Sequence, residues 1–239
     1  LIDDGKIILQ VQKTDRVSDV ELKVIQGGVL SSNKGVNLPN TKISMPALTN
    51  KDIKDAKLAA KLDVDWIALS FVRSKNDVLQ LKALIDKNSD HPIPVISKIE
   101  KPQAIKKMDQ ILKASDGLMV ARGDLGIEIP AEEVPLHQKI LVKKAKEARK
   151  PIIVATQMME SMIDNLTPSR AEVNDVANSV MDGADCIMLS GETSVGKYPC
   201  EVVKKIGGII SSVEDSQPAI IKFILPKFKT NRIITKTIC

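Results

Sequence analysis

The stretch Pro94-Val95-Ile96-Ser97-Lys98-Ile99-Glu100 decides how the rest of this chain is interpreted. Its first half is a short run rich in Val and Ile, which is typical of a buried strand. Residues i and i+2 of a strand point to the same side, so we expect Lys98 and Glu100 to project together. A matched cation and anion at a strand end indicates either a structural ion pair or half of a phosphate and metal site.

Short apolar strands alternate with amphipathic helices on both sides of this stretch. Expected strands cover residues 66–71, 94–100, 118–121, 152–156 and 186–189. Expected helices cover residues 50–62, 102–113, 136–149 and 199–213, and two more begin at the capping boxes Ser74/Asp77 and Ser169/Glu172, the second stopping at Gly183. This alternation predicts parallel strands covered on both faces. The sequence has no Gly-x-Gly-x-x-Gly and no Walker loop, which disfavours a nucleotide-binding doubly wound sheet.

Polar groups follow the carboxyl end of every one of the five strands. They are Ser70 and Arg73, Lys98 and Glu100, Arg122-Gly123-Asp124, Thr156-Gln157, and Ser190-Gly191-Glu192. Five such ends in a row are typical of a (β/α) barrel, whose active site is built from the loops at that rim. We therefore predict an α/β fold, a TIM-type (β/α)8 barrel that is incomplete here, with about five of its eight strands.

The residue types at this rim predict metal-assisted chemistry on a small anion. Glu100 and Asp124 are oxygen ligands on adjacent strands, which suit a hard divalent cation such as Mg²⁺. Lys98 suits phosphoryl oxygens or an oxyanion, and Thr156 supplies a hydroxyl. Gly123 lets an anion approach backbone N–H groups closely. The predicted ligand is a keto acid or a phosphorylated acid.

Some polar groups near the rim have simpler explanations. Arg122 either binds substrate or pairs with a neighbouring acid, and Glu192 is better explained as an acid at the start of a helix. Gln157 and the nearby methionines are interpreted as loop and packing residues; the methionines are Met158, Met159 and Met162. Asp3-Asp4 is interpreted as a turn rather than a metal site.

Composition narrows the classes of partner. The net charge of +5 is mild and only 2% of residues are aromatic, which disfavours a nucleic-acid partner. No apolar run is long enough to span a membrane, and the acidic residues Asp3 and Asp4 near the start are not those expected of a secretory signal. The three cysteines are far apart and make no metal spacing, which indicates a reducing cytoplasm.

Several runs of the sequence resemble the pyruvate kinase family. They are LIDDGKI (1–7), GGVLSSNKGVNLP (27–39), VDWIALSFVRS (64–74), ISKIE (96–100), SDGLMVARGDLGIEIP (115–130), VPLHQK (134–139), ATQMMESMI (155–163) and PSRAEVNDVANSVMDGADCIMLSGETSVGKYP (168–199). The resemblance covers about residues 1–215 in the same order. It implies that residues 1–28 end a small inserted antiparallel β domain, that 29–215 form the last part of a barrel, and that 216–239 begin a C-terminal domain.

The resemblance implies phosphoryl transfer from phosphoenolpyruvate to ADP, giving pyruvate and ATP. It implies Mg²⁺ or Mn²⁺ and K⁺ as cofactors, and a cytoplasmic parent enzyme that is a homotetramer. Carried over, Lys98 stabilises the transferring phosphoryl group and the enolate, Glu100 and Asp124 bind Mg²⁺, and Ser70 lies near the monovalent cation. Thr156 lies near the point where the enolate is protonated. The substrate-binding candidates are Lys98, Arg122, Gly123, Asp124 and Thr156.

The departures from the family pattern are mild within the motifs. Ser97 replaces a common Ala, Lys101-Pro102 a common Asn-x, and Met159 a common Leu. The first barrel strands have no counterpart, and five strands cannot close an eight-stranded barrel, so we expect no kinase turnover from these residues alone. Two alternatives stay open: a metal-dependent lyase or aldolase acting on pyruvate or oxaloacetate, and a catalytically silent chain that associates with others. Turnover that depends on ADP in the parent protein separates the first alternative from a kinase.

Overall fold

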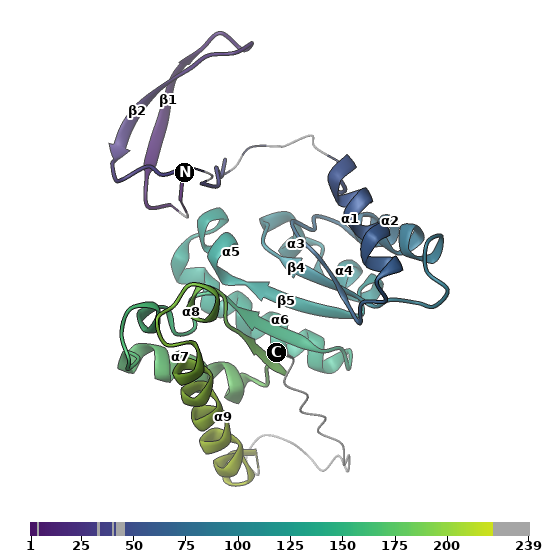
Figure 1. Ribbon diagram of the computed structural model, residues 1–239, viewed down its shortest axis with the longest axis vertical. Helices are drawn as coiled ribbons and strands as arrows, with labels where there is room; N and C mark the ends of the chain where they lie inside the picture. Colours follow the sequence, from purple (N-terminus) through teal and green to yellow (C-terminus); the bar gives the residue numbers. More distant parts are fainter. Residues whose placement is uncertain (4, 33, 40, 42–45, 222–239) are drawn as a thin grey trace.

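The computed structural model describes residues 1–3, 5–32, 34–39, 41 and 46–221, with side chains described up to residue 216. It contains a two-stranded hairpin and a five-stranded sheet (Figure 1). Cys186 and Cys200 are free thiols, whereas Cys239 and most of the expected C-terminal segment lie outside the described residues. Within the described part of the chain, no helix has both the length and the apolar character needed to cross a membrane.

The hairpin consists of β1 (Ile8–Thr14) and β2 (Val20–Gln26), which pair antiparallel as predicted. It stands away from the sheet and its helices (Figure 1). Every residue of β2 is exposed, and so are most residues of β1. With no second layer of described residues against it, neither face of the hairpin is covered.

The five-stranded sheet is parallel, and each strand pairs with the next one in the sequence. Its strands are β3 (Ile67–Leu69), β4 (Val95–Ile99), β5 (Gly117–Ala121), β6 (Ile152–Ala155) and β7 (Cys186–Met188). The order β3-β4-β5-β6-β7 is that of a continuous part of a barrel wall. Among the described residues β3 and β7 are free edges, so the predicted α/β barrel of about five strands is confirmed as an unclosed sheet.

Two strands end earlier than expected because the backbone turns. Phe71 has φ of 54° and Thr156 has φ of 73°, both in the left-handed region, which ends the extended conformation before each residue. Strand β3 therefore stops at Leu69 and β6 at Ala155. Neither residue is Gly or Asn, so the residue types did not signal these turns.

Helices connect successive strands, and two of them start at the predicted capping boxes. They are α1 (Asn50–Lys61), α2 (Lys75–Asp86), α3 (Pro102–Lys106), α4 (Met108–Ala114), α5 (Arg122–Glu128), α6 (Val134–Glu147), α7 (Arg170–Asp182), α8 (Gly191–Ser194) and α9 (Pro199–Ile221), with 3₁₀ turns η1 (Ala131–Glu133) and η2 (Glu160–Ile163). Both predicted capping boxes form, and Gly183 ends α7 with φ of 100°. The single helix expected over 102–113 is instead two, because Lys107 leaves the helical region at φ −112° and ψ 19°.

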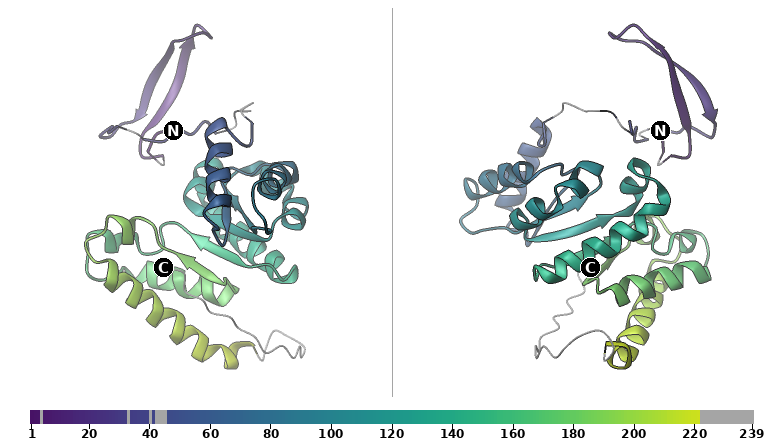
Figure 2. Two further views of the ribbon diagram at one scale, coloured as in Figure 1. Left: turned by 45° about the vertical axis from the view of Figure 1, so that its right-hand side comes forward. Right: turned by 180° about the vertical axis from the view of Figure 1, so that it is seen from behind.

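The hydrophobic core lies between one face of the sheet and the helices. Fully buried strand residues on this face include Val95, Ile99, Leu118, Val120, Ile152 and Val154. Helix α6 packs on β5 and β6, and helix α9 packs on α7 (Figure 2). On the opposite face Ile96, Lys98 and Ile153 are only half buried. The expected cover on both faces is met by β5, which is buried throughout, but only in part by β4 and β6, because an unclosed barrel wall leaves its inner face partly open.

A pair of buried serine hydroxyls joins β4 to the end of α4. Ser97 Oγ lies 2.6 Å from Ser115 Oγ, and both residues are fully buried. Ser115 Oγ donates to the Ile111 carbonyl at 2.8 Å. Because the Ser115 proton is used in that bond, Ser97 is the donor between the two hydroxyls.

We expect Ser115→Ala to lower the free energy of unfolding by about 1–3 kcal/mol, because it leaves the Ser97 hydroxyl buried without an acceptor. Ser97→Ala is the matched control: it removes the donor and leaves Ser115 bonded to Ile111, so we expect a loss of about 0.5 kcal/mol or less. Urea unfolding followed by the fluorescence of Trp66, the single tryptophan, measures both. Equal losses would contradict this assignment of the donor.

Candidate active site

The predicted pair at the end of β4 forms. Lys98 Nζ lies 2.7 Å from Glu100 Oε1 and donates to Ser70 Oγ at 3.0 Å. The Glu100 side chain is fully buried, and its Oε2 accepts a hydrogen bond from the backbone N–H of Phe71 at 2.5 Å. Glu100 Oε1 has no well-directed hydrogen bond, so the ammonium of Lys98 is the charge that compensates it. The expectation that Lys98 and Glu100 project together is confirmed.

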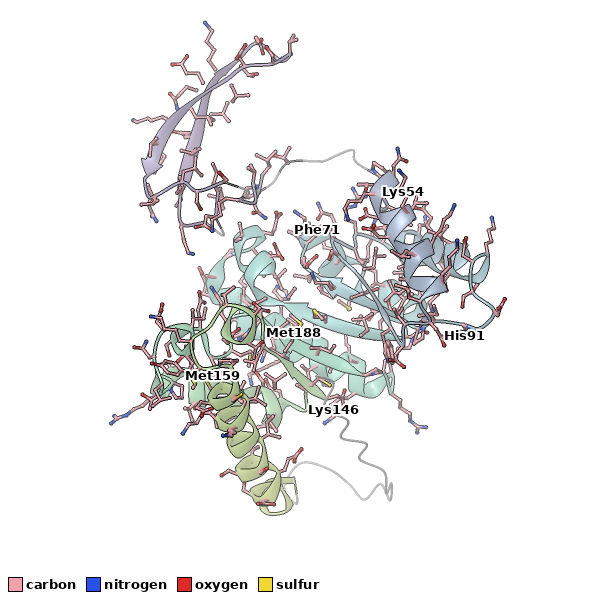
Figure 3. All side chains as sticks on the ribbon, viewed as in Figure 1. Lys54, Phe71, His91, Lys146, Met159 and Met188 are labelled. Carbon is pink, nitrogen blue, oxygen red and sulfur yellow. The ribbon has the colours of Figure 1, made fainter. Side chains whose placement is uncertain are left out.

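Three residues at this rim hold a backbone conformation that is rare for their type. Phe71, Thr156 and Gln157 have φ values of 54°, 73° and 54°. Phe71 follows the end of β3, on the side of the sheet toward the hairpin (Figure 3), and the other two follow β6. Each such residue costs about 1–3 kcal/mol and persists only where its surroundings hold it. The rim is therefore a place where the fold fixes loop conformation against local preference.

The hydroxyl of Thr156 connects β6 to the start of α5. Its Oγ1 accepts from the Gly123 N–H at 2.7 Å and donates to the Ala155 carbonyl at 2.6 Å. The Gly123 N–H that we expected to face an anion is thus bonded to Thr156. A Cβ at Gly123 would meet Thr156 Oγ1 at 3.4 Å, an ordinary contact, so the close approach of an anion to Gly123 stays a prediction. Asp124 lies beside Gly123 in the first turn of α5.

Arg122 pairs with an acid, as the simpler interpretation of this residue proposed. Its Nη1 lies 2.8 and 2.7 Å from the two carboxylate oxygens of Asp175 on α7. Its Nη2 donates to the carbonyls of Thr156 at 2.8 Å and Gln157 at 3.3 Å. One guanidinium therefore holds both left-handed residues of the β6 loop against α7. A direct role of Arg122 in binding substrate stays a prediction.

Glu192 lies in the first turn of α8, which confirms its interpretation as an acid at a helix start. It is also buried, and its carboxylate accepts from the N–H of Ser190 at 2.8 Å and of Met159 at 3.2 Å. It thereby joins the β6 and β7 loops, a link that no local pattern signals because it spans 33 residues. The three methionines of the β6 loop are fully buried, as expected for packing residues.

Glu172 joins the start of α7 to η2, which follows the β6 loop. Its carboxylate accepts from the N–H of Ser161 and of Ser169, each at 2.7 Å, and from both hydroxyls. Partial burial acts to raise the pKa of Glu172, but the hydrogen bonds from the two serines outweigh it and hold the pKa below its usual value. The loop carrying Thr156 is therefore fixed at its far end as well.

Asp3 at the other end of the chain behaves as the turn residue that we expected. Its carbonyl accepts from the N–H of Lys6 at 3.1 Å, and its φ is 52°. Its carboxylate lies 2.9 Å from Lys34 Nζ, and the hydrogen bond and charge of that lysine hold the pKa of Asp3 below its usual value. Asp4 lies outside the described residues.

A cleft of about 780 Å³ opens at this rim between α5, α6 and α7. Four of the predicted site residues line it: Arg122, Gly123, Asp124 and Thr156. Ser70, Lys98 and Glu100 belong to the next two strand ends along the sheet and do not line it. The sequence signals did not identify Gln138, Asn174, Asp175 and Asn178, which line the cleft from α6 and α7.

The residues at the rim fit a hard cation that takes two ligands from the chain and the others from substrate oxygens and water. Within the described ranges there is no group of three or more His, Cys, Asp or Glu side chains that could hold a metal ion. Glu100 and Asp124 follow adjacent strands, and Glu100 Oε1 is a buried oxygen without a well-directed hydrogen bond. Two carboxylates completed by substrate oxygens and water are a usual arrangement for Mg²⁺.

Comparison with known proteins finds one family over most of the chain. A family model described as the pyruvate kinase barrel domain matches residues 1–203. A pyruvate kinase of Mycobacterium intracellulare is 52% identical over 219 residues, which are 92% of this chain and 46% of that protein. Pyruvate kinases of Corynebacterium efficiens and Geobacillus stearothermophilus are 54% and 48% identical, with 45% and 37% of their lengths covered. The chain thus spans about half or less of the curated relatives that it matches.

Proposed function

The chain belongs to the pyruvate kinase family, and from this premise we propose that it carries the phosphoryl- and metal-binding half of a site that transfers phosphate from phosphoenolpyruvate to ADP. The observation that carries the proposal is the ion pair between Lys98 and the fully buried Glu100 at the end of β4, the strand next to the one that Asp124 follows. We further propose that residues 29–215 are the barrel part, with the end of an inserted domain in 1–28 and the start of a C-terminal domain in 216–239.

The proposal gives a separate role to each polar side chain at the rim. Lys98 Nζ places its charge against the phosphoryl oxygens and the enolate oxygen, where negative charge develops. Glu100 and Asp124 would hold Mg²⁺ or Mn²⁺, which supplies neutralisation of charge on the phosphoryl group. Thr156 Oγ1, fixed by the Gly123 N–H and the Ala155 carbonyl, lies near the point at which we propose that the enolate is protonated. Arg122 keeps the Thr156 loop in place and contributes to substrate binding.

The finer parts of the proposal come from the family. We propose K⁺ near Ser70, whose Oγ accepts from Lys98, and ADP or ATP as the second substrate. The names of the relatives support a glycolytic kinase, and we extend this to a cytoplasmic homotetramer for the whole protein. The proposal includes no nucleic acid and no membrane as partners, and no kinase turnover from these residues alone.

Calorimetry with oxalate, a planar dianion shaped like the enolate of pyruvate, tests this proposal on the chain itself. We expect heat of binding only when Mg²⁺ is present, and none in Asp124→Ala, because that variant lacks one of two carboxylate ligands. Asp109→Ala is the matched control, since it removes an exposed carboxylate on α4 that pairs with Lys144. Oxalate binding that needs no Mg²⁺, or that survives Asp124→Ala, would overturn the assignment of the metal site.

A further inference from the structure

Lys101 makes a nearly buried ion pair next to the proposed metal ligands. Its Nζ lies 2.6 Å from Glu128 Oε1, and the two side chains are only 14% and 5% exposed. The same ammonium lies 5.3 Å from the centroid of the Phe71 ring, within the range of a cation–π contact. One lysine therefore contacts the loop after β3 and the end of α5, and its own backbone directly follows β4.

The position of this pair relates it to both carboxylates of the proposed metal site. Lys101 is the residue after Glu100, whereas Glu128 lies four residues after Asp124 in α5. Residues i and i+4 of a helix lie on one face, with Cβ atoms about 5–6 Å apart. The ion pair thus links the end of β4 to α5 one helical turn away from Asp124.

The contact with Phe71 acts on Glu100 as well. Phe71 holds a left-handed backbone, and in that conformation its N–H donates to Glu100 Oε2 at 2.5 Å. The ring of Phe71 is half exposed, so packing alone holds it weakly. The ammonium of Lys101 over the ring supplies a second restraint on the same residue, and through it on the Glu100 carboxylate.

We propose that the Lys101–Glu128 ion pair is a positioning element that sets the separation of Glu100 and Asp124, and so sets the affinity of this site for a small divalent cation. The inference rests on the proposed function, which assigns those two carboxylates as ligands. A small cation tolerates little error in ligand spacing, since Mg²⁺ demands nearly ideal octahedral geometry. The lysine itself does not touch the metal or the substrate in this proposal.

The test is Mn²⁺ binding to the whole chain, measured from the electron paramagnetic resonance signal of the free ion. We expect Lys101→Met to weaken Mn²⁺ binding by about 10–100-fold, the usual effect of losing a group that orients a metal ligand. The direction is informative, because removing a positive charge near a cation site would by electrostatics alone strengthen binding. Lys101→Arg keeps the charge and the ring contact, so it should restore most of the affinity.

Three further variants complete the experiment. Glu128→Gln should weaken Mn²⁺ binding similarly, and the double variant should add little, because both changes break one contact. Lys144→Met is the control: it breaks an ion pair of the same 2.6 Å length with Asp109, with side chains 36% and 73% exposed on other helices, and should leave Mn²⁺ affinity unchanged.

The outcomes separate the inference from the function on which it rests. Mn²⁺ binding that is lost in Glu100→Gln but unchanged in Lys101→Met overturns the positioning role and leaves the metal site standing. The same holds if Lys101→Met lowers the urea midpoint of unfolding while Mn²⁺ affinity stays constant, which is the signature of a purely structural ion pair. No Mn²⁺ binding by the unsubstituted chain, or binding that survives Glu100→Gln, overturns the metal assignment itself.

Discussion

Lys98→Met is expected to lower the free energy of unfolding by about 3 kcal/mol, since it leaves an uncompensated buried charge. The remaining carboxylate of Glu100 is fully buried and keeps one hydrogen bond, from the Phe71 N–H. Its Oε1 lies 2.7 Å from Lys98 Nζ and has no well-directed hydrogen bond, so without the ammonium no group compensates the charge on that buried oxygen. Urea unfolding at pH 7, followed by Trp66 fluorescence, measures the change.

Glu100→Gln is the matched variant, and its expected cost is smaller, about 1 kcal/mol. The Lys98 side chain is 24% exposed, so its charge can reach water when the carboxylate is gone. The Gln carbonyl can still accept from Phe71. The double variant Lys98→Met/Glu100→Gln should be more stable than Lys98→Met alone, because it buries no charge. If Lys98→Met costs no more than Glu100→Gln, the buried carboxylate is not what Lys98 stabilises.

The same substitution also tests chemistry. We assign Lys98 to the phosphoryl and enolate oxygens, so Lys98→Met should weaken Mg²⁺-dependent binding of oxalate, an analogue of the enolate, by about 100-fold, the size of the rate loss when one donor to a developing oxyanion is removed. Glu100→Gln should also weaken oxalate binding, and adding Mg²⁺ should no longer increase the affinity for oxalate, because one of the two proposed metal ligands is gone. A Lys98→Met chain that is destabilised but binds oxalate normally would limit Lys98 to a structural role.

The sequence predicted what depends on neighbours in the chain. Lys98 and Glu100 share a side because a strand has a period of two residues, and this is set by local geometry. The capping boxes at Ser74 and Ser169 formed for the same reason, since their partners lie three residues away. The parallel sheet also followed from the alternation of apolar strands and helices.

The contacts that hold the rim together were not predictable in this way. Arg122 and Asp175 are 53 residues apart, and Met159 and Glu192 are 33 apart. Only tertiary packing brings residues of α7 and α8 to these partners, so an acid near Arg122 could be expected but not named. The left-handed turn at Thr156 has no Gly or Asn to announce it, because tertiary hydrogen bonds rather than residue type hold it.

Arg122→Lys is expected to weaken Mg²⁺-dependent oxalate binding by about 100-fold, through displacement of the Thr156 loop rather than loss of charge. The guanidinium bonds both oxygens of Asp175 and two consecutive carbonyls in the β6 loop. Lysine brings the same charge but has no planar fork, so it cannot hold Asp175 and the carbonyl of Thr156 together. Without that clamp the left-handed residues should relax, and the Thr156 hydroxyl should leave the Gly123 N–H.

Three measurements distinguish this from general destabilisation. Amide hydrogen exchange at Gly123 should accelerate in Arg122→Lys, because its acceptor is the Thr156 hydroxyl. Asp175→Asn keeps an acceptor for the guanidinium and should have a smaller effect on oxalate binding. Lys143→Met breaks a pair with Glu147 within α6, whose side chains are 77% and 63% exposed and lie outside the cleft, so it should cost under about 1 kcal/mol and leave binding unchanged. Normal oxalate affinity in Arg122→Lys, with the Gly123 amide still protected, would show that the β6 loop holds its own conformation and that Arg122 serves only to attach α7.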